Sequence, residues 1–70
     1  MNPVYSVVIP CYNEEESINE THRRLSAVMR GMGEAYELVY VNDGSRDKTP
    51  ELLDKLADGD KNVRVLHFAA

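Results

Sequence analysis

Three short runs rich in β-branched and aromatic residues, separated by two segments with helical periodicity, constrain the fold of this chain most strongly. The runs cover Tyr5 to Ile9, Leu38 to Val41 and Val63 to Phe68. The first run is expected to end at Pro10, because proline cannot donate to a strand ladder. The alternation predicts an α/β fold in the order β-α-β-α-β, with parallel strands joined by right-handed crossovers.

The first helix is predicted from Glu14 to about Met32, with Asn13 as its N-cap. Three glutamates at positions 14–16 then fall in its first turn, where the helix dipole favours negative charge, and Gly31 and Gly33 end it. Its inner face is formed by Ile18, His22, Leu25, Met29 and Met32.

The second helix is predicted to begin with Thr49 as N-cap and Pro50 at the first helical position. The acidic residues Asp58 and Asp60 close this helix as a solvated turn. Its apolar face comprises Leu52, Leu53, Leu56 and Ala57.

Seventy residues allow one small domain, which buries roughly 60% of its unfolded surface. The single cysteine, Cys11, excludes an internal disulfide and fits a reducing compartment. A net charge of -4 with scattered basic residues argues against a nucleic-acid partner. The chain has neither a signal-peptide pattern nor an apolar run near the roughly 20 residues of a membrane span. We therefore expect a cytoplasmic segment that makes no membrane contact itself.

The first strand is apolar enough to be flanked on both sides. In the usual 3-2-1 strand order it is central only if a fourth strand pairs with its outer edge, and the sequence supplies no fourth strand. We therefore expect residues 1–70 to be the N-terminal, truncated piece of a larger domain. The alternative is a small intact protein that pairs this edge between subunits.

Polar, acidic and aromatic residues follow the first two strands directly. The carboxyl ends of parallel strands meet at one rim, so the segment after Ile9 should lie beside the segment after Val41. There Asp43 offers a carboxylate to a ribose or a base N–H, Tyr12 a stacking ring, and Glu14 an acceptor for ligand hydroxyls or a base edge. These residues predict a nucleotide pocket. The glycine-free first turn argues against a dinucleotide site, and no P-loop pattern is present.

Each candidate also has a structural interpretation. Residues 43–45 could form a turn in which glycine supplies a positive φ and aspartate bonds nearby amides. Tyr12 could be an exposed loop aromatic, and Pro10 could only end a strand. Glu15 and Glu16 are assigned to the helix dipole.

Three further reactive side chains are expected to be structural. Cys11 has no base partner nearby in sequence and is expected to be a buried hydrophobe, not a nucleophile. His22 lies on the apolar helix face and is expected to be packed, and His67 has no ligand-like companions. We therefore predict no catalytic residue and no metal ligand among these 70 residues.

Two motifs, SVVIPCYNEE at 6–15 and VYVNDGSRDKT at 39–49, resemble the start of family 2 glycosyltransferases with the GT-A fold. The resemblance covers essentially the whole chain, and Asn42 makes it most similar to the polyprenyl-phosphate (dolichol-phosphate-type) branch. It implies a Rossmann-like, three-stranded half of a GT-A nucleotide-sugar-binding domain. It also implies that the donor nucleotide is lined by Pro10, Tyr12, Glu14, Val41 and Asp43.

The resemblance further implies a divalent cation, Mg²⁺ or Mn²⁺, which a D-x-D pair holds against the donor diphosphate in the complete domain. Asp58 and Asp60 have the matching letters but precede the third strand, so they are not expected to be that pair. Acceptor-binding residues, a catalytic base and any membrane segments would lie beyond Ala70.

The favoured function is therefore the donor-binding segment of a glycosyltransferase that moves a sugar from a nucleotide-diphosphate sugar to an acceptor such as polyprenyl phosphate. The parent protein would work at the cytoplasmic face of a membrane, and the 70-residue chain alone is expected to be inactive. Two alternatives stay open: a non-catalytic nucleotide-binding module, and a structural fragment that self-associates through the edge of its first strand.

Overall fold

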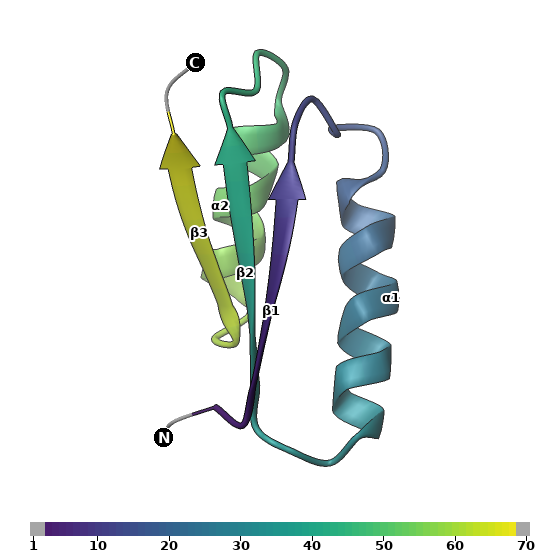
Figure 1. Ribbon diagram of the computed structural model, residues 1–70. Coiled ribbons are helices and arrows are strands. Elements are labelled where there is room, and N and C mark those ends of the chain that lie inside the picture. Colours follow the sequence, from purple (N-terminus) through teal and green to yellow (C-terminus); the bar gives the residue numbers. More distant parts are fainter. Residues whose placement is uncertain (1–2, 69–70) are drawn as a thin grey trace.

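The computed structural model describes residues 3–68 and contains five elements in the predicted order (Figure 1). These are strand β1 (Tyr5–Cys11), helix α1 (Ile18–Gly31), strand β2 (Tyr36–Asp43), helix α2 (Thr49–Gly59) and strand β3 (Val63–Phe68). The strands form one parallel sheet in the order β1-β2-β3, with β2 in the centre. The predicted α/β fold and strand order are confirmed.

The predicted end of the first strand was wrong, because β1 continues through Pro10 to Cys11. Pro10 is the register partner of Val41 in β2. Among the described residues β1 has no neighbour on its outer side. Proline is tolerated in such an edge strand, where its missing N–H need not interrupt a central ladder.

The predicted start of the first helix was also wrong, because α1 begins at Ile18 with Ser17 as its N-cap. Asn13 has a φ of 50°, which takes the backbone off the helical path. The Glu14 carbonyl then accepts the N–H groups of Ser17 and Ile18, at 3.1 and 2.9 Å. Residues 14–17 therefore form a separate turn ahead of the helix. The end of α1 at Gly31 is as predicted, and Gly33 has a φ of 73°.

Helix α2 begins one residue earlier than predicted. Lys48 is the N-cap, so Thr49 is already helical, with Pro50 in the first turn. The hydroxyl of Thr49 is consequently available to another segment. The predicted apolar face is confirmed: Leu53 is buried and Leu52, Leu56 and Ala57 pack around it.

The core lies between one face of the sheet and the two helices. Its buried apolar residues are Cys11, Ile18, Met29, Tyr36, Leu38, Tyr40, Leu53 and Val63. In β2 every second residue is buried, as expected for a sheet covered on one face. Burial of each large aliphatic side chain stabilises the fold by roughly 1.5–3 kcal/mol.

Both helices cover the same face of the sheet, because two successive right-handed crossovers proceed in one direction (Figure 1). The opposite face is open over the described residues. Its apolar side chains include Val8 and Phe68, which are 62% and 55% exposed. Neither helix within residues 3–68 is long and apolar enough to cross a membrane.

Candidate functional site

The carboxyl ends of β1 and β2 bring the two sequence motifs to one rim of the sheet (Figure 1). The last register pair of these strands is Cys11 with Asn42. Tyr12 and Asp43 therefore follow at neighbouring positions, as expected for parallel strands. The loop of residues 12–17 and the loop of residues 44–48 both begin at this rim, and we call them the first and second rim loops.

Asn13 makes two hydrogen bonds that join the rim loops. Its backbone N–H donates to Ser45 Oγ at 3.0 Å, and its Oδ1 accepts the backbone N–H of Arg46 at 2.8 Å. Asn13 makes both bonds from a left-handed backbone, with a φ of 50°, a conformation that asparagine tolerates better than most residues. Asn13 is therefore a connector between the loops and not a helix cap.

Two further hydrogen bonds extend this connection toward α2. The N–H of Glu14 donates to Thr49 Oγ1 at 2.7 Å, and the N–H of Glu15 donates to Asp47 Oδ2 at 3.2 Å. Asp47 Oδ1 also accepts the N–H of Thr49 at 2.9 Å. Burial opposes ionisation of Asp47, but the hydrogen bonds from Thr49 and Glu15 outweigh it and lower the pKa of this carboxyl.

A hollow of about 520 Å³ opens beside the first rim loop. This volume lies within the range of small-molecule sites, roughly 300–1,000 Å³. Tyr12, which is 56% exposed, contributes an accessible ring. Because the lining carries four carboxylates, it suits hydrogen-bond donors such as hydroxyls and base N–H groups. The lining residues are Tyr12, Asn13, Glu14, Glu15, Glu16, Ser17 and Asp47.

Only two of the five predicted binding residues line this hollow. Tyr12 and Glu14 line the hollow. Pro10 and Val41 are register partners that alternate with buried positions, so they lie on the open face of the sheet. Asp43 is the exposed last residue of β2, and among residues 3–68 no hydrogen bond or ion pair engages its carboxylate.

The turn after β2 is built on Asn42, which is 5% exposed. Asn42 Oδ1 accepts the N–H of Ser45 at 3.1 Å, and Asn42 Nδ2 lies 3.0 Å from His67 Nδ1. Gly44 has a φ of 71° and donates its N–H to the Phe68 carbonyl at 2.9 Å. The turn interpretation is thus correct for the glycine, but the side chain that bonds the turn amide is Asn42 and not Asp43.

Sequence reasoning missed the residues that hold the two rim loops together. Asn13 and Thr49 were expected to be helix caps, whereas Asn13 bonds the second rim loop and Thr49, the first residue of α2, bonds the first rim loop. The available signal was the presence of short polar side chains directly after two strands that must be neighbours. Such side chains often satisfy backbone groups in turns and loops.

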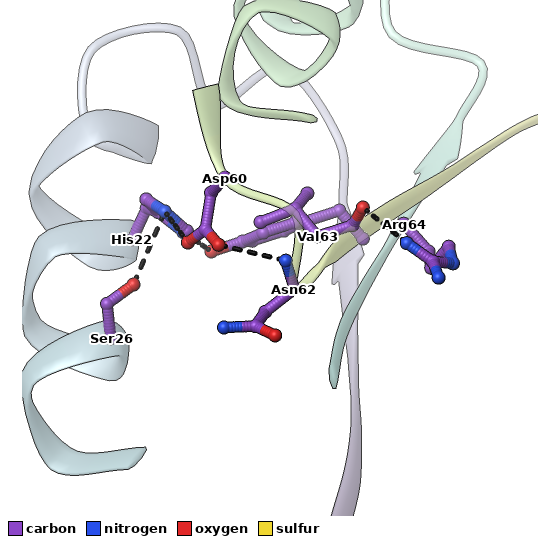
Figure 2. A network of polar contacts seen from close by, with 7 residues as sticks. His22, Ser26, Asp60, Asn62, Val63 and Arg64 are labelled. Carbon is purple, nitrogen blue, oxygen red and sulfur yellow. Dashed lines mark hydrogen bonds and ion pairs between the residues drawn. The ribbon is translucent and has the colours of Figure 1, made fainter. Parts of the chain in front are cut away.

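A second polar cluster joins α1, β2 and the start of β3 (Figure 2). His22 Nε2 lies 3.3 Å from Asp60 Oδ2, which can only accept, so this nitrogen carries a proton. In the neutral ring Nδ1 then accepts the Tyr40 hydroxyl at 2.7 Å. Ser26 Oγ lies 3.3 Å from Nε2. Burial raises the pKa of Tyr40 to about 12, and the Asp60 carboxylate and, in alkali, the Cys11 thiolate act in the same direction.

This cluster confirms that His22 is packed, since its side chain is 13% exposed. The solvated-turn interpretation was wrong for Asp60, which bonds His22 and also accepts the N–H of Asn62 at 2.9 Å. The physical reason is that α2 ends against α1, within reach of its inner face. We assign the cluster a structural role, in which it joins α1, β2 and the segment between α2 and β3.

Cys11 is a buried residue, 2% exposed, as predicted. Burial raises its pKa to about 11, and the nearby Glu14 carboxylate acts in the same direction. A thiol in this environment stays protonated near neutral pH and is a poor nucleophile.

The comparisons with known proteins agree with this architecture. Residues 6–70 match the family model described as glycosyl transferase family 2. The chain therefore belongs to glycosyl transferase family 2. Its β-α-β-α-β fold with a parallel three-stranded sheet is Rossmann-like and consistent with a GT-A domain.

Several curated relatives are similar over most of this chain. An uncharacterised glycosyltransferase of Bacillus subtilis, YkcC, is 46% identical over 93% of the chain and 20% of its own length. An undecaprenyl-phosphate 4-deoxy-4-formamido-L-arabinose transferase of Pseudomonas paraeruginosa is 54% identical over 79% of the chain and 16% of its own length. A transferase of the same description from Edwardsiella ictaluri is 46% identical over 87% of the chain and 19% of its own length. The chain thus spans at most a fifth of these relatives.

The family resemblance implies a divalent cation, and the described residues do not fit one. Within residues 3–68 no three His, Cys, Asp or Glu side chains come together as metal ligands would. Asp60 is engaged by His22 and Asn62, and Asp58 is exposed at the end of α2. No cation chemistry is therefore assigned to these residues.

Proposed function

We propose that residues 1–70 form the N-terminal, donor-binding part of a glycosyltransferase domain. The complete enzyme would transfer a sugar from a nucleotide-diphosphate sugar to a polyprenyl phosphate at the cytoplasmic face of a membrane. The observation that supports this proposal is that hydrogen bonds join the two rim loops: Tyr12 and Glu14 lie in the first loop, and the unengaged Asp43 comes directly before the second. The relatives named as undecaprenyl-phosphate transferases support the acceptor class.

Each proposed binding residue has a role that suits its chemistry. Tyr12 stacks on the base, Glu14 accepts from ligand hydroxyls or the base edge, and Asp43 accepts from the ribose or a base N–H. Pro10 and Val41 give apolar contact from the open face of the sheet. These residues bind the donor and perform no bond-breaking step, so the 70-residue chain alone has no transferase activity. A cation, Mg²⁺ or Mn²⁺, would be held by other parts of the complete domain.

The proposal is tested by titrating the ¹⁵N-labelled chain with UDP and with GDP, followed by NMR. At least one nucleotide should shift the amides of Tyr12, Glu14 and Asp43. Asp43→Ala should weaken binding about tenfold or more, since a hydrogen bond to a charged group contributes roughly 1.5–3 kcal/mol. Asp58→Ala, an exposed control at the end of α2, should leave affinity unchanged. Equal affinities of the wild type and Asp43→Ala would refute the pocket.

Membership of family 2 favours a transferase over a non-catalytic nucleotide-binding module. Self-association is a separate candidate that one observation favours: β1 is an unpaired edge within residues 3–68, beside the exposed Val8. Sedimentation velocity from micromolar to millimolar concentration tests it. A dimer that Val8→Lys disrupts would support pairing through β1, and a monomer throughout would exclude it.

A further inference from the structure

We propose that His67, acting through Asn42, is a positioning residue for the turn that carries Asp43. The neutral His67 ring holds this turn in the observed conformation, and protonation of the ring releases it. The inference rests on the proposed function only for its effect on nucleotide binding. The structural coupling itself is independent of any ligand.

The orientation of the Asn42 amide follows from its neighbours. The backbone N–H of Ser45 can only donate, so the atom 3.1 Å away is the carbonyl oxygen Oδ1. The amide nitrogen Nδ2 therefore faces His67 Nδ1, at 3.0 Å. Since Nδ2 can only donate, Nδ1 accepts and bears no proton.

The other ring nitrogen completes a single protonation pattern. His67 Nε2 lies 2.9 Å from Asp54 Oδ1, so Nε2–H donates to this carboxylate. The neutral Nε2–H tautomer of His67 therefore satisfies its own contacts with Asn42 and Asp54, and it leaves Asn42 Oδ1 free to accept the Ser45 N–H. Among the described residues, the charged group recorded against the ring is Asp54 from α2, and β2 contributes the uncharged Asn42 amide.

Protonation of His67 adds a proton to Nδ1. Two hydrogen-bond donors, Nδ1–H and Asn42 Nδ2, then face each other. The conflict is relieved if the amide rotates to offer Oδ1 to the ring, and Ser45 N–H then loses its acceptor. The rotated amide presents Nδ2 to the Ser45 N–H instead, so two donors face each other beside Asn42, which is 5% exposed. Asp54 favours the charged ring, but its side chain is 65% exposed and the attraction is weakened by solvent.

The turn transmits this change to the first rim loop. Ser45 Oγ accepts the N–H of Asn13 at 3.0 Å, so Ser45 belongs to both contacts. Gly44 is bonded to the Phe68 carbonyl, the residue after His67 in β3. Loss of the Ser45–Asn42 bond therefore disturbs the residues on either side of Asp43 as well as the link to Asn13.

The test is an NMR titration of the 70-residue chain between pH 5 and 8. The amide chemical shift of Ser45 should change with the same midpoint pH as the chemical shifts of the His67 ring. At pH 8 the His67 ring nitrogens should show the Nε2–H tautomer. His22, the other histidine, is an internal control whose protonation should not move the Ser45 amide. A Ser45 amide that is insensitive to the His67 titration would overturn the proposal.

Two variants distinguish coupling from a general effect of pH. His67→Gln should abolish the titration of the Ser45 amide. Asn42→Asp supplies a carboxylate that accepts from both Ser45 N–H and the protonated ring, so protonation no longer breaks the turn and the response should disappear. If either variant keeps the wild-type response, the proposed relay through Asn42 is wrong.

Nucleotide titrations at different pH values distinguish this inference from the proposed function. UDP or GDP affinity should fall about fivefold as His67 protonates in the wild type, the effect of one lost neutral hydrogen bond, and stay constant in His67→Gln. If the Ser45 amide follows His67 but neither nucleotide binds, the relay stands and the proposed function fails. If a nucleotide binds while Ser45 ignores His67, the relay fails alone.

Discussion

Asn13 and Arg46 are hydrogen-bonded across 33 positions of sequence, with the Arg46 N–H 2.8 Å from Asn13 Oδ1. Because the Asn13 N–H also donates to Ser45 Oγ, one asparagine holds the two rim loops together from both its backbone and its side chain. Asn13 makes these bonds with its backbone at a φ of 50°. The left-handed backbone and the pairing of the two rim loops therefore meet at one residue, Asn13.

The Asn13 connection predicts a graded loss of stability. Asn13→Ala removes the acceptor and places a Cβ-bearing residue without a compensating side-chain bond in the left-handed region, so the free energy of unfolding should fall by about 2 kcal/mol. Asn13→Gly keeps the conformation and should cost about 1 kcal/mol. Urea denaturation measures both. Asn19→Ala, an exposed asparagine of α1, is the matched control and should change stability little. Equal stabilities of Asn13→Ala and Asn19→Ala would contradict the connection.

Thr49 should protect the Glu14 amide from hydrogen exchange. Thr49→Val keeps the buried volume but removes the hydroxyl 2.7 Å from the Glu14 N–H, so this amide should exchange faster and the protein should lose about 1–2 kcal/mol. Thr49→Ser retains the acceptor and should keep the protection, even though it loses a methyl group. Fast exchange in Thr49→Ser would show that the bond does not form in solution.

Tyr40 should stabilise the fold through its hydroxyl as well as its ring. Tyr40→Phe leaves Nδ1 of the largely buried His22 without its donor, and we expect a loss of about 1 kcal/mol in urea denaturation. Tyr36 is the control: it is buried in the same strand, and its hydroxyl makes no hydrogen bond within residues 3–68. A double-mutant cycle with His22→Ala should attribute most of the loss to this pair. Equal effects of Tyr40→Phe and Tyr36→Phe would argue against it.

Cys11 should make the protein less stable in alkali. The folded pKa of its thiol is raised from 9.0 to about 11, so its contribution to stability is complete below pH 9 and is lost as the pH rises to 11. Tyr40, raised from 10.0 to about 12, acts with the same sign at higher pH. Urea denaturation at several pH values should therefore show a shallower decline between pH 9 and 11 in Cys11→Ala. Parallel declines in the two proteins would contradict the assignment.

The order of elements could be predicted because each element carries its own pattern. The bounds of β3 are as predicted, since Val63 to Phe68 is a continuous β-rich run after a clear helix stop. The start of α1 could not be predicted in the same way. Glutamates at 14–16 are good helix formers, but the amides of Glu14 and Glu15 are bonded by side chains 35 and 32 residues away. Long-range contacts therefore override local propensity there.

The candidate site could be predicted in outline only. Parallel strands require the residues after Cys11 and after Asn42 to share a rim, and they do. The partners within the rim depend on the register of β1 against β2 and on one positive φ, at Asn13, which no periodicity reveals. His67 was set aside because its neighbours in sequence offer nothing, whereas Asn42 and Asp54 reach it through space. The ligand-binding roles of Pro10, Tyr12, Glu14, Val41 and Asp43 stay predictions.

The two faces of the sheet have different structural roles. Leu38 and Tyr40 face the helices and hold the domain together, while Val41 and its register partner in β1, Pro10, lie on the open side. Mutation can therefore alter the open side without disturbing the packing that keeps the chain folded. A scaffold divided in this way can change one surface over evolution while its interior stays the same.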